Sequence, residues 1–201
     1  MKTAGFPVTE TQQAATPPMK KLRFKAFLTK KGKVVIPKNQ KTGCRIEELK
    51  TRGYGKLAKD RLFLAPCEAL FLLNKNVIDL VDEETAEPVD FQRLLHVFER
   101  VDPDLWVKFL IYRDLRSRGY VVRGGFGLGI DFRAYEKGRY GKETAKYLIL
   151  GIQEGKPVTV EELTRILRHV QSLKKKLVLA VLSRRGEVVY YSLSKLTLTK
   201  I

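Results

Sequence analysis

Hydrophobic residues recur along most of the chain with the spacing of helices or strands, which indicates a folded protein. From Leu105 to Leu115 the residues are apolar almost all round, a pattern typical of a helix buried on most of its surface. In another helical segment, Thr159 and Glu162 have the spacing of a capping box. The periodicity predicts helices over 47–53, 65–74, 91–101, 105–115 and 158–168.

Strand-like segments separate these helices, with apolar residues that alternate with polar ones or run continuously. The first two segments predict a hairpin, and the first strand of that hairpin carries several basic residues. This basic ribbon is equally compatible with a surface that lies on RNA and with a solvated face over a small sheet. The pattern predicts strands over 20–28, 33–36, 62–64, 77–80, 120–122, 130–135, 146–151, 177–182 and 188–193.

The glycine-rich segment GGFGLG at 124–129 resembles a phosphate-binding loop in composition. A strand follows it rather than a helix, so the helix N-terminus that would bind phosphate is missing. We interpret it as a tight β-turn between two strands.

The order of the elements predicts an α/β (α+β) fold with two domains. Residues 1–18 are rich in Thr, Gln, Ala and Pro, and we expect them to form a disordered leader. A change in the sign of the charge places the boundary at Asp102-Pro103-Asp104. This gives a small mixed N-terminal domain over 19–103 and a second domain over 104–201.

Positive charge is the strongest signal in the composition. The net charge of +17 divides into +11 over residues 1–60, −6 over 61–104 and +12 over 105–201. Such an excess attracts polyanions and releases their counterions, so nucleic acid is the first partner to consider. A charged surface of the kind found in thermophiles would instead mix the two signs.

Few residues suit a metal or cofactor. Cys44, Cys67, His96 and His169 are the only cysteines and histidines, and they lack metal-ligand spacing. We expect no metal and no cofactor. No apolar run approaches the roughly 20 residues that span a bilayer, and the N-terminus lacks the apolar core of a secretory signal. A cytoplasmic protein without membrane contact is expected.

The second half of the chain contains YRDLRSRGYVV, a glycine-broken turn, DFRAY, and a strand of the type KYL. These motifs resemble the C-terminal domain of archaeal tRNA-splicing endonucleases, and the resemblance covers roughly residues 105–193. Two weaker similarities lie in the first half, at GYG (53–55) and over 62–74. The resemblance implies a restriction-nuclease-like fold for the second domain.

In this family a tyrosine, a histidine and a lysine form the catalytic site. Tyr135 matches the tyrosine and Lys175 the lysine, whereas Thr144 stands at the position expected for the histidine. The resemblance implies metal-independent cleavage by the ribose 2′-OH, with tyrosine as base, histidine as acid and lysine as electrostatic clamp. A threonine hydroxyl does not release its proton near neutral pH, so no catalytic set is intact.

The resemblance implies the role of a structural subunit in a heterotetramer with a catalytic paralogue that cleaves bulge-helix-bulge introns in precursor tRNA. A catalytic subunit that recruits His169 as a displaced acid, and a stand-alone basic RNA-binding protein, are the alternatives. The loop Ser183–Glu187 departs from the family pattern because it is not acidic. Either this loop has no docking role, or this subunit receives the acidic loop of another subunit rather than supplying one. We expect RNA contacts from Arg133, Lys137, Arg139, Lys142, Lys174 and Lys176. The expected subunit interface consists of Val188, Val189, Tyr190, Tyr191 and Leu193.

Overall fold

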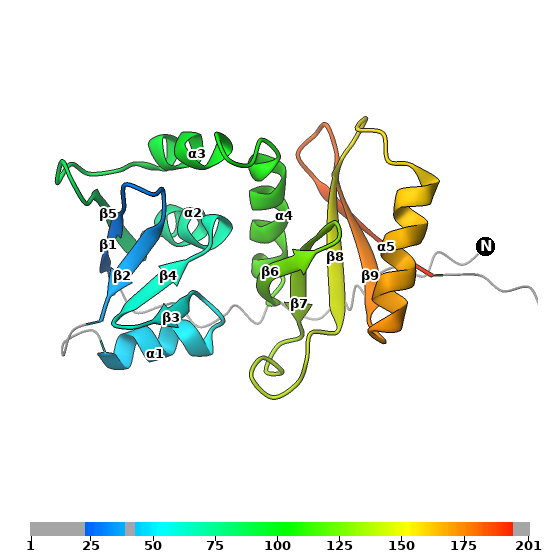
Figure 1. Ribbon diagram of the computed structural model, residues 1–201, viewed down its shortest axis with the longest axis horizontal. Helices are drawn as coiled ribbons and strands as arrows, with labels where there is room; N and C mark the ends of the chain where they lie inside the picture. Colours follow the sequence, from blue (N-terminus) through cyan, green and yellow to red (C-terminus); the bar gives the residue numbers. More distant parts are fainter. Residues whose placement is uncertain (1–22, 39–42, 195–201) are drawn as a thin grey trace, which may run out of the picture. The chain divides into compact units, whose positions relative to one another are not determined.

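The computed structural model of the chain describes residues 23–38 and 43–194 (Figure 1). The expected leader and the start of the first predicted strand lie outside the described residues. The described residues divide into two compact units, which meet in sequence at Arg113 and Asp114, within helix α4 (Leu105–Ser117). The domain boundary expected at 102–104 lies just before this helix and stays a prediction. No helix within the described residues is long and apolar enough to cross a bilayer.

The first unit contains a five-stranded sheet with the strand order β3-β4-β2-β1-β5. Strands β1 and β2 form the predicted antiparallel hairpin, and β5 pairs with β1 in parallel. Burial alternates along β1 as a half-exposed strand requires, since Phe24, Ala26 and Leu28 are buried whereas Lys25 is exposed. The elements are β1 (Phe24–Leu28), β2 (Val34–Pro37), α1 (Gly43–Thr51), β3 (Lys56–Ala58), β4 (Arg61–Leu64), α2 (Pro66–Asn74), β5 (Ile78–Asp82) and α3 (Phe91–Glu99).

A buried carboxylate joins the two segments of this unit that carry the weaker similarities. Glu68 in α2 is only 2% exposed. Its Oε2 accepts hydrogen bonds from the backbone N–H of Gly55, at 2.9 Å, and of Ala65, at 3.0 Å. Because an ionised group is costly to bury without partners, these bonds fix the turn after α1 against the start of α2.

Ion pairs within this unit neutralise part of its basic ribbon. Acidic side chains of β5 and of the turn after it pair with basic side chains from other segments of the unit. These pairs are Arg23–Asp79 at 3.3 Å, Arg61–Glu83 at 3.2 Å, and Lys30–Glu84. The negative segment 61–104 is therefore partly an internal counter-charge, which favours the interpretation of Arg23 and Lys30 as part of a solvated face.

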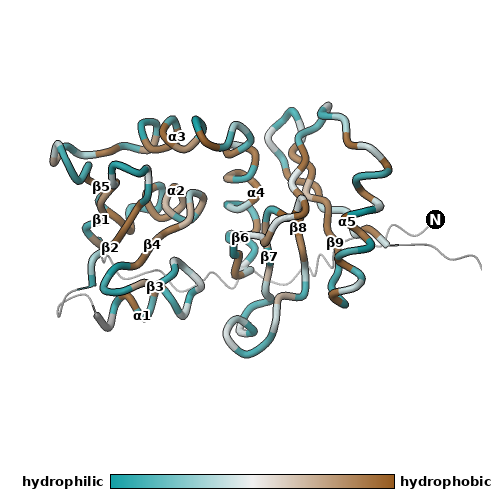
Figure 2. Tube along the Cα trace, viewed as in Figure 1, coloured by the Kyte–Doolittle hydropathy of each residue, from teal (hydrophilic) through white to brown (hydrophobic). Residues whose placement is uncertain are grey.

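The second unit contains a sheet with the strand order β10-β9-β8-β7-β6. Strands β8 and β9 are parallel and are joined through helix α5, and the other neighbours are antiparallel. Both β8 and β9 are hydrophobic over most of their length, as central strands are (Figure 2). The elements are β6 (Val121–Gly127), β7 (Ile130–Tyr135), β8 (Tyr147–Gln153), α5 (Val160–Ser172), β9 (Lys176–Leu182) and β10 (Val188–Leu193).

Helix α5 covers one face of this sheet. Its N-cap Thr159 accepts a hydrogen bond from the backbone N–H of Glu162 at 3.1 Å, as the predicted capping spacing requires. The core beneath the helix contains Ile130, Leu148, Ile166, Val170 and Leu177. The predicted helices and strands of both units are confirmed in type, and with them the mixed α+β fold.

The predicted tight turn in the glycine-rich segment is present, but it is shorter than the sequence interpretation had it. Strand β6 continues through this segment to Gly127, and only Leu128 and Gly129 form the turn. Both turn residues have positive φ, 56° and 79°, as a type I′ hairpin requires. A side chain at Gly125 would meet the backbone oxygen of Ile130 at 1.8 Å, so this glycine permits the close approach of β6 and β7.

Other differences concern short or polar segments. Helix α1 begins at Gly43, four residues before the predicted start, and α4 extends two residues beyond the predicted end. Strand β3 was not predicted, because its three residues are too few for a strand period.

Leu128 and Gly129 allow a matched test of the turn. Leu128→Asn should stabilise the protein by about 0.5–1 kcal/mol, because asparagine tolerates positive φ better than leucine. Gly129→Ala should destabilise it by about 1–3 kcal/mol, since the new Cβ would lie 2.8 Å from Ile166 Cδ1. Urea unfolding followed by circular dichroism measures both; a stabilising Gly129→Ala would contradict this account of the turn.

Candidate active site

The positions matched to the catalytic tyrosine and lysine lie at one edge of the second unit's sheet. Ala134 in β7 pairs with Tyr147 in β8, which in turn pairs with Lys176 in β9. Strand β7 runs opposite to β8 and β9, so the end of β7 and the starts of the other two strands meet at the same edge. The next row outward consists of Tyr135, Lys146 and Lys175.

The turn after α5 positions Lys175. Lys174 adopts φ 54°, in the left-handed region, and the N–H of Lys175 then donates to the carbonyl of Val170 at 3.1 Å. This backbone conformation costs about 1–2 kcal/mol for a residue with a side chain. It brings Lys175 Nζ to Thr144 Oγ1, to which it donates a hydrogen bond of 2.5 Å.

Tyr135 ends β7 beside the loop 136–143. Its ring packs edge-on against Tyr140, with ring centres 5.0 Å apart and planes at 88°. The structure therefore joins Thr144 to Lys175 directly and places Tyr135 in the same row as Lys175. A lysine beside a hydroxyl can bind a phosphate, because both offer hydrogen-bond donors.

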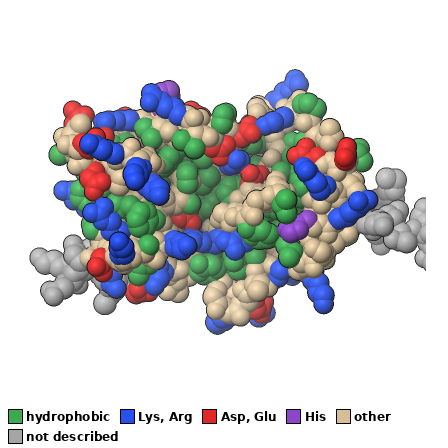
Figure 3. Space-filling model, in the orientation of Figure 1, with side chains coloured by type: hydrophobic (Ala, Val, Ile, Leu, Met, Phe, Trp, Pro, Cys, Tyr) green, Lys and Arg blue, Asp and Glu red, His purple; other side chains and the backbone are tan. Residues whose placement is uncertain are grey.

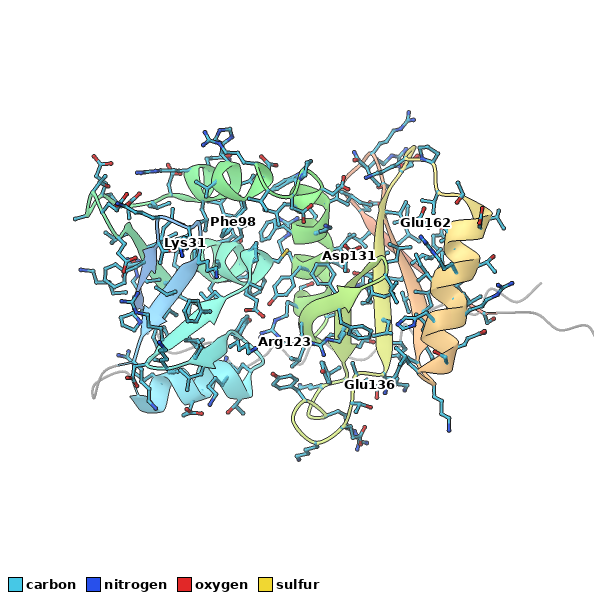
Figure 4. All side chains as sticks on the ribbon, viewed as in Figure 1. Lys31, Phe98, Arg123, Asp131, Glu136 and Glu162 are labelled. Atoms are coloured by element: carbon cyan, nitrogen blue, oxygen red, sulfur yellow. The ribbon has the colours of Figure 1, made fainter. Side chains whose placement is uncertain are left out.

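A second polar group at this edge centres on Glu136, which begins the loop after β7 (Figure 4). Glu136 Oε1 accepts hydrogen bonds from Lys146 Nζ at 2.6 Å and from Tyr147 Oη at 3.2 Å. The bond to Lys146 holds the pKa of Glu136 below its usual range and raises the pKa of Lys146. Burial raises the pKa of Tyr120, whose ring packs edge-on against Tyr147. None of these groups is tuned to act as a general acid near neutral pH.

His169 lies on α5, where its imidazole packs edge-on against Phe126 with ring centres 6.4 Å apart. Its Nε2 is buried and makes no hydrogen bond within residues 23–38 and 43–194. A general acid must reach the oxygen that it protonates. This placement favours a packing role for His169 over a role as a displaced acid.

The residues expected to bind RNA lie around this edge in different settings. Arg133 Nε donates to the carbonyl of Gly124 at 2.9 Å, and its guanidinium lies over the ring of Phe126 at 5.6 Å. Arg139 forms an exposed ion pair with Glu143 at 2.6 Å. The remaining four side chains are exposed: Lys137, Lys142, Lys174 and Lys176.

The residues expected at a subunit interface divide between the two faces of β10, which is an edge strand. Val189 and Tyr191 are 43% and 55% exposed. Tyr190 faces its own chain, where its hydroxyl donates to Asp114 Oδ2 at 2.6 Å, and burial raises its pKa. Leu193 packs against the core beneath α5, and Val188 is half-buried.

Sequence analysis did not identify Glu136, Lys146 or Phe126 as members of this region. The row formed by Tyr135, Lys146 and Lys175 depends on the register between strands, which no local pattern reveals. Phe126 was hidden inside the segment interpreted as a turn. Phe126 is the one large apolar residue in the segment 123–127, so no alternation of apolar and polar residues indicated that the strand continues to Gly127.

Comparison with known proteins places both units in one family. Residues 105–190 match the catalytic C-terminal domain of the tRNA intron endonucleases, and residues 30–95 match their N-terminal domain. A tRNA-splicing endonuclease of Methanococcus maripaludis is 36% identical over 153 residues, which cover 76% of this chain and 86% of that protein. A tRNA-splicing endonuclease of Pyrococcus furiosus is 36% identical over 140 residues, which cover 70% of this chain and 79% of that protein.

These similarities define a protein of the RNA-cleaving endonuclease class. The chain belongs to the tRNA intron endonuclease family, which confirms the resemblance found in its motifs and the two-domain arrangement.

The pairing of Glu136 with Lys146 predicts a measurable titration. A carboxyl whose pKa is lowered on folding stabilises the fold above its ordinary pKa of about 4.3, and this contribution is lost as the pH falls through the folded pKa. Lys146→Met should therefore move the pKa of Glu136 back up toward its ordinary value. Carbon-detected NMR titration of the Glu136 carboxyl measures its pKa in the wild type and in Lys146→Met. An unchanged pKa of Glu136 in Lys146→Met would show that a group other than Lys146 lowers it.

Proposed function

We propose that the chain is a structural subunit of a tRNA-splicing endonuclease and assembles with a catalytic paralogue that cleaves introns from precursor tRNA. The observation that carries the proposal is Thr144, which stands at the histidine position and accepts a hydrogen bond from Lys175. The strand edge thus keeps a tyrosine and a lysine, and has a hydroxyl where the acid belongs.

The chemistry explains why this substitution matters. In the proposed reaction the ribose 2′-OH attacks the adjacent phosphate, which leaves a 2′,3′-cyclic phosphate and a 5′-OH. The step needs a base for the 2′-OH, an acid for the leaving oxygen and a cation for the developing charge. Tyr135 and Lys175 have the chemistry of the first and third roles. Loss of a positioned acid typically lowers the rate by about 10²–10⁴-fold.

The proposed partner is a paralogue that carries the histidine, in a heterodimer of dimers. Strand β10 supports this assembly because its outer edge is unpaired within the described sheet and it exposes Val189 and Tyr191. The loop before β10 is a tight turn, closed by the bond from Ser183 N–H to the Glu187 carbonyl, and it is basic rather than acidic. It therefore lacks the charge to dock into a basic pocket.

Precursor tRNA with a bulge-helix-bulge intron is the proposed substrate of the assembly, and the cytoplasm is the proposed location. The supporting observation is the concentration of basic side chains around the strand edge, from Arg133 through Lys142 to Lys176. A stand-alone RNA-binding protein would share this charge. It would not need the family's tyrosine and lysine at one strand edge.

Returning the acid to this chain tests the proposal directly. We expect Thr144→His, assembled with a paralogue whose catalytic histidine is replaced by alanine, to cleave bulge-helix-bulge RNA without metal. The rate should exceed that of the same complex with wild-type chain by about 10²-fold or more. Thr144→Ala is the matched control.

Adding Lys175→Met to Thr144→His should abolish the gained cleavage. Metal-independent cleavage by the wild-type chain alone, lost in His169→Ala, would instead establish the displaced acid.

The exposed face of β10 gives a test of assembly. Val189→Asp and Tyr191→Asp should each weaken association with the paralogue by about 2 kcal/mol or more, because each would bury a charge at an apolar contact. Val160→Asp is the control, since Val160 is 80% exposed at the start of α5. Sedimentation velocity measures the complex; equal association by all three variants would remove β10 from the interface.

A further inference from the structure

Next to the strand-edge site lies a group of side chains that the family chemistry does not use. Phe126 is 48% exposed on β6. His169 supports it edge-on at an interplanar angle of 72°, and the guanidinium of Arg133 lies 5.6 Å from its ring centre. We call Phe126, Arg133 and His169 the aromatic platform. Figure 3 shows a histidine among hydrophobic side chains on the viewed face.

The backbone holds this platform at a cost to the fold. The turn beside it places Leu128 at φ 56°, with its side chain 58% exposed. Leucine gains little from such exposure, and asparagine or glycine would adopt the turn more readily. Backbone strain of this kind is common at functional surfaces.

The platform is cationic and continuous with the strand-edge site. Arg123 and Arg133 are directly opposite each other in the β6–β7 register, so their side chains share a face. The two arginines add positive charge to this face, which favours an anionic ligand. Arg133 and Tyr135 also share a face of β7, two residues apart, which is about 7 Å along a strand.

The geometry points to the aromatic platform as a stacking site for an unpaired nucleobase, whose phosphate pairs with Arg133. This inference rests on the proposed function, because it assigns the platform to the RNA that the strand edge would hold. An aromatic ring flanked by a guanidinium is the surface on which single-stranded RNA bases stack. A protein occupant is disfavoured, because it would have to desolvate the Arg133 guanidinium without supplying a counter-charge.

The first measurement is binding of a fluorescein-labelled single-stranded RNA to the full chain, followed by anisotropy. Phe126→Ala should weaken binding by roughly 5- to 150-fold, which is the usual range for loss of one stacked base. Phe126→Tyr should bind like wild type, because it keeps the ring. Val160→Ala removes an exposed apolar residue elsewhere on the same unit and should also leave the affinity unchanged.

Direct stacking is detected by Phe126→Trp in a Trp106→Phe background, where position 126 carries the single tryptophan. Single-stranded RNA should quench its emission, and a duplex of the same length should not. Equal binding by Phe126→Ala and wild type, or emission unchanged by RNA, would overturn the inference. Loss of paralogue association in Phe126→Ala with unchanged RNA affinity would assign the platform to a protein partner and overturn it as well.

These outcomes separate the platform from the proposed function. If Phe126→Ala does not weaken RNA binding in a chain that still assembles and supports cleavage, the stacking site is rejected and the proposed function stands. If RNA stacks at position 126 in a chain that never assembles with a paralogue, the structural-subunit role is rejected and the stacking site stands.

Discussion

The parallel pairing of β8 with β9 is the constraint on which the strand-edge site depends. Parallel neighbours need a crossover, and α5 provides it, so the chain returns to the same edge at which β8 began. The left-handed residue Lys174 ends that crossover and delivers Lys175 beside Thr144. A shift of the register by one residue would turn Lys175 to the other face of the sheet.

The side chains at this edge can change without disturbing the core of the second unit. Thr144 is exposed, so the core beneath α5 does not depend on which side chain stands there. The ionised groups nearby have partners of their own, since Glu136 binds Lys146 and Tyr147, and Asp114 binds Tyr190 and Arg118. A chain of this family can therefore exchange the acid for a hydroxyl without loss of its structure.

The sequence predicted the helices and strands that have a long, regular hydrophobic period. It did not predict the strand segments that are defined only by hydrogen bonding to a neighbouring strand. The buried helix α4 and the amphipathic α5 follow from apolar spacing, and the hairpin of β1 and β2 from alternation. Strand β3 and the second half of β6 carry too few apolar residues to show a period, and only their partners define them.

For the site, the motifs predicted Tyr135, Thr144 and Lys175 from their resemblance to the family, and this assignment stays a prediction. Two of the contacts made by Glu136, Lys146 and Phe126 join residues far apart in sequence: Glu136 with Lys146, 10 positions apart, and Phe126 with His169, 43 positions apart. Distances of this kind depend on register and crossover, which single-sequence patterns do not contain. The sequence likewise did not predict which basic side chains of the N-terminal unit form ion pairs within that unit.

The contact between Lys175 and Thr144 also bears on stoichiometry. Under the proposed function, an edge that keeps its cation but has no general acid can hold a phosphate without breaking the ester next to it. In an assembly with a histidine-bearing paralogue, the strand edges of this chain would bind RNA, and the equivalent edges of the paralogue would cleave it. The number of scissions per bound transcript would then be limited by the copies of the paralogue rather than by the number of nuclease-like domains.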